Sequence, residues 1–116
     1  MSIWLTPPVE LEPGIHLVRW RIFQRENGKA HFVGYYPDGF EGRVSSAIES
    51  FDPITRRGVT QSGRVYQLVG WPGFDPDAMQ LWELWSRAKG WENCADVTED
   101  VLAGLLQAVN WKPSDA

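Results

Sequence analysis

The sequence predicts an α+β fold, in which a five-stranded antiparallel curled sheet or small open barrel is followed by two C-terminal helices. The 116 residues include 43% hydrophobic residues, which suits one domain with its own core. Short apolar segments separated by turn residues fill positions 15–70, and apolar residues recur at helical spacing after Gly70. We therefore expect a single domain over 1–116, with an extended arm (1–14), an antiparallel β meander (15–70) and a two-helix part (71–116).

The dipeptide Asn27-Gly28 predicts a tight hairpin between the apolar segments 15–25 and 30–36. Both central residues of a type I′ turn need a positive φ, which Asn and Gly tolerate best. This turn pairs Phe23 with Phe32 and places the more apolar residues on the core face, namely Val18, Trp20, Ile22, Val33 and Tyr35 with Gln24 and His31 at its end. The opposite face then carries Arg19, Arg21, Phe23, Arg25, Phe32 and Tyr36.

The remaining strands of the meander are expected at 43–51, 57–62 and 64–69. Ser62-Gly63 predicts a second tight hairpin, in which a two-residue loop sets Val59 opposite Tyr66. Before the meander, Pro7, Pro8 and Pro13 predict the extended arm.

Two helices are expected after the meander. Asp75-Pro76-Asp77 has the features of a helix start, and Gly90 those of a helix end. Between them, apolar residues recur at helical spacing at Ala78, Leu81, Trp82, Trp85 and Ala88. The second helix is expected to begin at Thr98, with an apolar stripe of Val101, Leu102, Leu105, Leu106 and Val109.

The charge of the chain is unevenly distributed. The net charge is −4, but residues 14–70 hold eight Lys and Arg against five acids (+3), whereas residues 71–116 hold three against eight (−5). The two parts are expected to attract each other or to offer partners a basic and an acidic face. The single cysteine, Cys94, the absence of long apolar segments and the start of the chain predict a cytoplasmic protein without membrane contact.

Few residues suggest catalysis or metal binding. The chain has no CxxC, HExxH, calcium-loop, Walker or dinucleotide-binding motif, so we expect no metal, no cofactor and no catalytic residue. Carboxylate pairs and Cys94 leave a small enzyme as the last alternative.

The residues that we expect to bind a partner are those of the basic and aromatic hairpin face, Arg19, Arg21, Phe23, Arg25, Phe32 and Tyr36. The leading interpretation is contact with another protein. Single-stranded nucleic acid is the alternative, because guanidinium groups bind phosphates while bases stack on rings. A third interpretation is that the arm or a helix covers the aromatics, and that the acidic helices pair with the arginines.

Four tryptophans, Trp4, Trp71, Trp91 and Trp111, fall in arms, linkers and ends, where burial is harder. Exposed Trp and Arg are typical interface anchors, which favours a partner-binding protein or a homodimer.

Arg43-Val44-Ser45-Ser46-Ala47-Ile48, Phe51-Asp52-Pro53 and Thr60–Gly70 resemble segments of small uncharacterised bacterial accessory proteins of plasmids, prophages and integrative elements. The resemblance covers about 30 residues and implies an accessory, inhibitor or immunity-type role. It supplies no active site. Together with the hairpin face, it leads us to expect a non-catalytic binding module.

Overall fold

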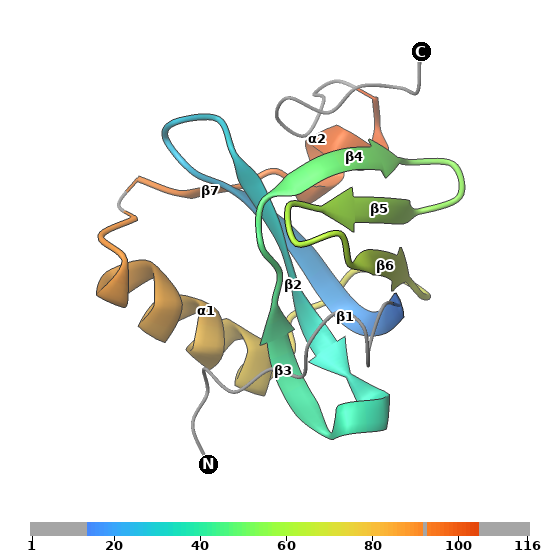
Figure 1. The fold of residues 1–116 in the computed structure, drawn as a ribbon, viewed down its shortest axis with the longest axis horizontal. Helices are drawn as coiled ribbons and strands as arrows, with labels where there is room; N and C mark the ends of the chain where they lie inside the picture. Colours follow the sequence, from blue (N-terminus) through green and yellow to red (C-terminus); the bar gives the residue numbers. More distant parts are fainter. Residues whose placement is uncertain (1–13, 92, 105–116) are drawn as a thin grey trace.

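The computed structural model describes residues 14–91 and 93–104, and Figure 1 shows their arrangement. Six strands form an open, mixed sheet in the order β3-β2-β1-β6-β5-β4, and a short strand β7 pairs with β1. The elements are β1 (Gly14–Gln24), β2 (Ala30–Tyr36), a 3₁₀ turn η1 (Pro37–Gly39), β3 (Glu41–Val44), β4 (Ile48–Asp52), β5 (Arg57–Thr60), β6 (Val65–Leu68), α1 (Pro76–Ala88), β7 (Ala95–Asp96) and α2 (Thr98–Leu102). The α+β class is confirmed, and the sheet is not a closed barrel.

The sheet is not antiparallel throughout, because β6 runs parallel to the first part of β1. The expected strand 43–51 is divided into β3 and β4, yet both parts continue in one direction. The chain therefore reverses its direction an even number of times between β1 and β6, and β6 runs in the same direction as β1. Counting local turns predicts antiparallel neighbours and misses this long-range pairing.

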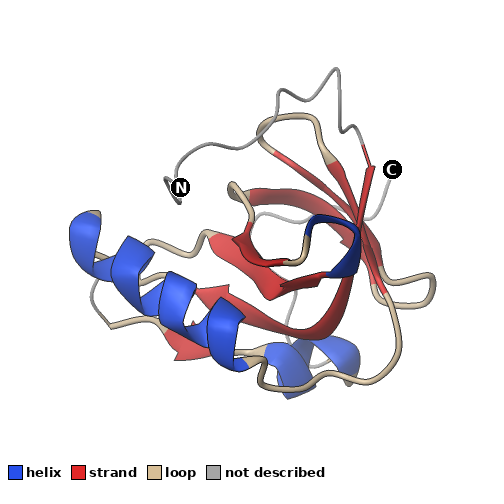
Figure 2. Ribbon diagram, turned by 90° about the horizontal axis from the view of Figure 1, so that it is seen from below, coloured by secondary structure: helices blue, strands red, loops and turns tan. Residues whose placement is uncertain are grey.

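Strand β1 belongs to two halves of the sheet. Residues 14–17 pair with β6, and residues 18–24 pair with β2 in the antiparallel sense. Between Val18 and Arg21 the register shifts, and Arg19 has a φ of +47°. Such a bulge bends a strand and increases its twist, so the sheet curves at this point. Figure 2 shows the strands bending around a common interior, with α1 outside the sheet.

Both hairpins differ by one residue from the predicted register. Arg25 N donates to Lys29 O (2.7 Å) and Gly28 N to Arg25 O (2.9 Å), which closes a three-residue loop. Gly28 has a φ of +95°, whereas Asn27 does not have a positive φ. This geometry is a type I turn followed by a left-handed glycine, which suits the sequence Asn-Gly as well as a type I′ turn does.

The second hairpin repeats the same loop around Gly63 (φ +90°), with Thr60 N donating to Arg64 O at 3.1 Å. Val59 accordingly pairs with Val65 instead of Tyr66.

A corner at Ser45 separates β3 from β4. The Ser45 N–H donates to the carbonyl oxygen of Phe32 (2.9 Å), and its hydroxyl oxygen accepts from the Phe32 N–H (2.8 Å). A side chain thus replaces a backbone partner, which lets the chain leave β2 and cross to β5. The composition of 43–51 does not reveal this, because its residues suit a continuous strand.

The part of the sheet formed by β1, β2 and β3 is covered on both faces. The main core lies inside the bend and consists of Ile15, Leu17, Trp20, Ile22, Ala30, Phe32, Tyr36, Ile48, Phe51, Tyr66, Leu68, Val97 and Val101. A second core lies under α1, where Val33, Val44, Ala78 and Trp82 pack together. Because Val33 belongs to this second core, the predicted single core face is wrong.

Both helix starts are confirmed. The Asp75 carboxylate accepts from the Ala78 N–H (3.0 Å) and caps α1, and Pro76 is its first residue. Gly90 follows the helix with a φ of +69°, and α2 begins at Thr98 as expected. The arm up to residue 13 and the predicted stripe from Leu105 onward lie outside the described residues. In the described ranges, no helix is long and apolar enough to cross a membrane.

Gly42 sets how closely α1 approaches β3. A Cβ at this position would lie 2.8 Å from the Cα and N atoms of Ala78, which are backbone atoms and cannot rotate away. We expect Gly42→Ala to push α1 outward and to lower the free energy of unfolding by about 1–3 kcal/mol. Chemical denaturation measures this loss. Gly14→Ala is the control, since nothing lies within 4 Å of its Cβ; equal stability of the two variants would contradict the close approach.

Candidate functional site

The six residues predicted to bind a partner do not share one exposed face. Phe32 and Tyr36 are buried in the main core, with exposed fractions of 0% and 7%. Phe23 stacks on Trp82 of α1, with ring centroids 5.0 Å apart. The one-residue difference in hairpin register explains the separation, because Ile22, instead of Phe23, pairs with Phe32.

The three predicted arginines are held by contacts within the chain. The Arg21 guanidinium donates to Asp96 (2.8 Å) and Glu99 (2.9 Å), and its side chain is only 6% exposed. Arg19 pairs with Asp75 at 3.0 Å. Arg25 lies over the ring of Trp91, 4.3 Å from its centroid. The acidic C-terminal part thus neutralises two arginines of this face, as the third interpretation of the sequence anticipates.

Exposed apolar side chains lie elsewhere in the fold. Among the described residues, the exposed large apolar side chains are Phe40, Ile54, Val69, Trp71, Phe74 and Leu84. Four of them lie on the loops 53–56 and 69–75, and Trp71 is 83% exposed. We call Ile54, Val69, Trp71 and Phe74 the Trp71 patch.

Hydrogen bonds join the two loops of the Trp71 patch. The Arg56 guanidinium donates to the Gly70 carbonyl (3.0 Å), and the Gln67 amide donates to the Thr55 carbonyl (2.8 Å). The Leu68 N–H donates to the Arg56 carbonyl at 2.9 Å. These bonds place the turn that carries Ile54 beside the end of β6, from which Val69 and Trp71 follow.

Strand β1 fixes the loop 69–75 from the other side. The Trp20 indole donates to the Val69 carbonyl (3.2 Å), and the Gly73 N–H donates to the Trp20 carbonyl (3.2 Å). The Phe74 ring lies 4.1 Å from the guanidinium carbon of Arg21. The backbone on both sides of Trp71 is therefore attached to the sheet, while the indole itself is presented to solvent.

Basic groups border the Trp71 patch. Arg56 contacts its loop directly, and Arg57 is exposed beside it with a hydrogen bond to the neutral Gln67. Asp75 lies at the end of the loop, but its carboxylate already pairs with Arg19. The sequence pattern does not predict this patch beyond Trp71, because Ile54, Val69 and Phe74 lie in turn and linker segments without periodicity.

A second aromatic group lies between the β1–β2 hairpin and the end of α1. His31 stacks on Trp91 with centroids 4.5 Å apart, and Trp82 lies 5.7 Å from Trp91. The His31 imidazole is 2% exposed, and its Nδ1 lies 2.8 Å from the Ser45 carbonyl oxygen, which accepts its proton. Among the described residues, no hydrogen-bond partner reaches its Nε2. Burial lowers the pKa of His31 to about 4, so the ring is neutral at pH 7.

The described residues give catalysis little support. Within them, no group of three His, Cys, Asp or Glu side chains is arranged to hold a metal ion. The Cys94 thiol donates to the Trp91 carbonyl (3.4 Å), and burial raises its pKa. A raised pKa keeps the thiol protonated near neutral pH, which is the opposite of nucleophile activation.

Comparisons of the chain with protein-family models, with curated proteins and with solved structures find no match. The resemblance to accessory proteins of mobile elements therefore stays a prediction.

Arg21 is expected to stabilise the fold. Arg21→Met keeps the length of the side chain but leaves Asp96 and Glu99 without their cation, so we expect a loss of about 1–3 kcal/mol in the free energy of unfolding. Urea denaturation measures the loss, and the exposed Arg57→Gln is the control. An unchanged urea midpoint for Arg21→Met would show that the ion pairs of Arg21 contribute nothing to stability.

His31 is expected to make stability depend on pH. Its pKa is about 4 in the folded protein and about 6.5 in the unfolded chain, so the unfolded chain binds the proton first as pH falls. Stability is therefore full above pH 6.5 and decreases toward pH 4, by about 2 kcal/mol between pH 7 and pH 5. Urea denaturation of the wild type, His31→Gln and the exposed His16→Gln checks this. Only His31→Gln should flatten the dependence of the free energy of unfolding on pH. Equal slopes in all three proteins would refute the role of His31.

Proposed function

We propose that this protein is a non-catalytic binding module that recognises another protein through the Trp71 patch. The observation that carries the proposal is the exposure of Trp71 at the centre of a loop whose backbone is hydrogen-bonded to the sheet on both sides. Exposed apolar groups that serve no core are typical of interaction surfaces, and Trp is the commonest interface anchor. An anchor that is held in place loses little conformational entropy on binding.

The charges around the Trp71 patch indicate the chemistry of the partner. Arg56 and Arg57 border the patch. Of the carboxylates next to it, Asp75 pairs with Arg19, Asp96 and Glu99 pair with the Arg21 guanidinium that lies over Phe74, and Asp52 accepts from the Ile54 N–H (2.8 Å). The partner we propose therefore presents an apolar pocket for the indole, with acidic groups beside it. An accessory, inhibitor or immunity-type role in the cytoplasm, as the sequence suggests, is compatible with such a surface.

Removal of the Trp71 indole is expected to abolish partner binding without affecting the fold. Trp71→Ala removes an 83% exposed side chain, so the thermal midpoint should remain unchanged. Loss of a tryptophan anchor typically costs at least about 2 kcal/mol of binding free energy, a weakening of about thirtyfold. Quantitative affinity capture from nuclease-treated host lysate compares the variant with the wild type.

Leu84→Ala is the matched control, because Leu84 is also an exposed apolar residue but lies on α1, outside the patch. The proposal requires one protein that the wild type and Leu84→Ala capture in equal amounts and that Trp71→Ala does not. If the captured protein is a second copy of this chain, the Trp71 patch forms a homodimer interface. If every captured protein is retained by Trp71→Ala, the Trp71 patch is not the binding surface.

A further inference from the structure

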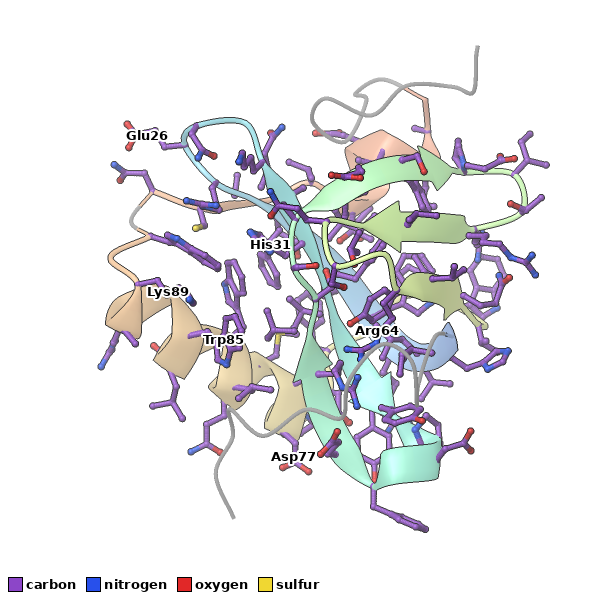
Figure 3. All side chains as sticks on the ribbon, viewed as in Figure 1. Glu26, His31, Arg64, Asp77, Trp85 and Lys89 are labelled. Atoms are coloured by element: carbon purple, nitrogen blue, oxygen red, sulfur yellow. The ribbon has the colours of Figure 1, made fainter. Side chains whose placement is uncertain are left out.

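A shallow depression of about 360 Å³ lies between the tip of the β1–β2 hairpin and the end of α1. It is lined by Arg25, Glu26, Asn27, Gly90 and Trp91, none of which belongs to the Trp71 patch. Figure 3 shows Glu26 at the hairpin tip and Lys89 at the end of the helix, with His31 and Trp85 between the helix and the sheet. The volume is within the range of small-molecule sites.

A stacked platform forms part of this depression. The Arg25 guanidinium carbon lies 4.3 Å from the Trp91 ring centroid, and the His31 imidazole stacks on the same indole at 4.5 Å. Trp82 supports the indole further at 5.7 Å. Trp91 is thus fixed from within the protein. Nucleobases stack on aromatic rings and on guanidinium planes alike, so the platform suits a flat, polar ring.

Two cations lie against the aromatic rings of the platform, and a third is their neighbour across the hairpin. Arg25 lies over Trp91, and its N–H donates to the carbonyl oxygen of Lys29 (2.7 Å). The Lys89 ammonium lies 5.0 Å from the Trp85 ring centroid and 5.9 Å from that of Trp91. Among the residues that line the depression, Glu26 is the one acid. Arg25 and Glu26 balance each other within the lining, so the positive charge of the described surroundings comes from Lys29 and Lys89. It favours an anionic group such as a phosphate next to the stacked ring.

The polar groups of the hairpin tip complement the edge of a base. The Asn27 side-chain oxygen accepts from the Lys29 N–H (3.0 Å), which leaves its amide hydrogens free to donate. One Glu26 carboxylate oxygen accepts from Asn93 at 3.4 Å, and no described residue donates to the other. A carboxylate with a free oxygen can accept from an exocyclic amine, as Glu does with cytosine.

We propose that this depression binds a nucleoside monophosphate unit whose base carries an exocyclic amine. The base stacks on the Arg25 guanidinium, which itself lies over Trp91, and its amine donates to Glu26. The phosphate binds Lys29 and Lys89. The unit is either a free nucleotide or part of a single strand, since both present the same base and phosphate.

An NMR titration of the ¹⁵N-labelled protein tests the proposal directly. Cytidine monophosphate should shift the Trp91 indole and Gly90 amide resonances in a saturable manner, with half-saturation below about 1 mM. Uridine monophosphate, which lacks the exocyclic amine, should bind more weakly, and inorganic phosphate should leave the Trp91 indole unshifted. Saturable shifts confined to other parts of the protein, or no shifts at all, would overturn the proposal.

Variants separate the stacking contact from the contact with the exocyclic amine. Arg25→Gln should weaken binding of cytidine monophosphate at least about tenfold, which a loss of one charged contact produces. Glu26→Gln should abolish the preference for cytidine over uridine monophosphate. Arg57→Gln is the control, because it removes an exposed arginine outside the depression. Unchanged affinity in Arg25→Gln would refute the site even if the nucleotide binds elsewhere.

A short oligocytidylate distinguishes the two sources of the nucleotide. If it binds more tightly than the monomer, with an affinity that falls as salt rises by about 0.7 log units per log unit for each phosphate neutralised, the natural ligand is a single strand. If it binds no more tightly, the ligand is a free nucleotide. Because the depression and the Trp71 patch share no residue, Trp71→Ala should leave the binding of cytidine monophosphate and of oligocytidylate unchanged.

Discussion

The fold depends on the bend in β1 at Arg19. By pairing with β6 before the bend and with β2 after it, one strand holds both halves of the sheet. The same bend sets the Trp20 indole and carbonyl against the loop 69–75, which carries Trp71. Arg19 pairs with Asp75 at the start of α1. Arg21 pairs with Asp96 and Glu99, which follow α1 in the chain. The C-terminal segments therefore take their positions from this strand.

Local chemistry in the sequence predicts the ends of elements well and their pairing less well. Asp75, Pro76 and Gly90 mark α1 because caps act within one turn. Gly28 and Gly63 mark the hairpins, but a left-handed glycine fits loops of two and of three residues. The protein uses the three-residue loop, so every pair predicted from a two-residue loop is one residue out of register. The parallel pairing of β1 with β6 joins residues about 50 positions apart, which no local pattern encodes.

The candidate sites follow the same division. Alternation predicts the hairpin face, but the observed register differs by one residue, so Phe32 lies inside the core and Phe23 lies under α1. The charge asymmetry was informative, since acids after residue 70 neutralise arginines before it. In contrast, the Trp71 patch is assembled from two loops that the pairing of β5 with β6 and the hydrogen bonds of Arg56 and Gln67 bring together. Such a surface depends on tertiary contacts, so of its members the sequence indicates only Trp71.

The unequal burial of the tryptophans also makes the protein its own optical reporter. Among the described tryptophans, Trp20 and Trp82 are buried and Trp85 and Trp91 are half-buried, whereas Trp71 is exposed. The Trp71 indole should emit at the red edge of the fluorescence spectrum. Of the five described tryptophans, it should also be the most accessible to a dissolved quencher. A partner that covers this indole would shield it and shift its emission to the blue, so binding can be followed without a label.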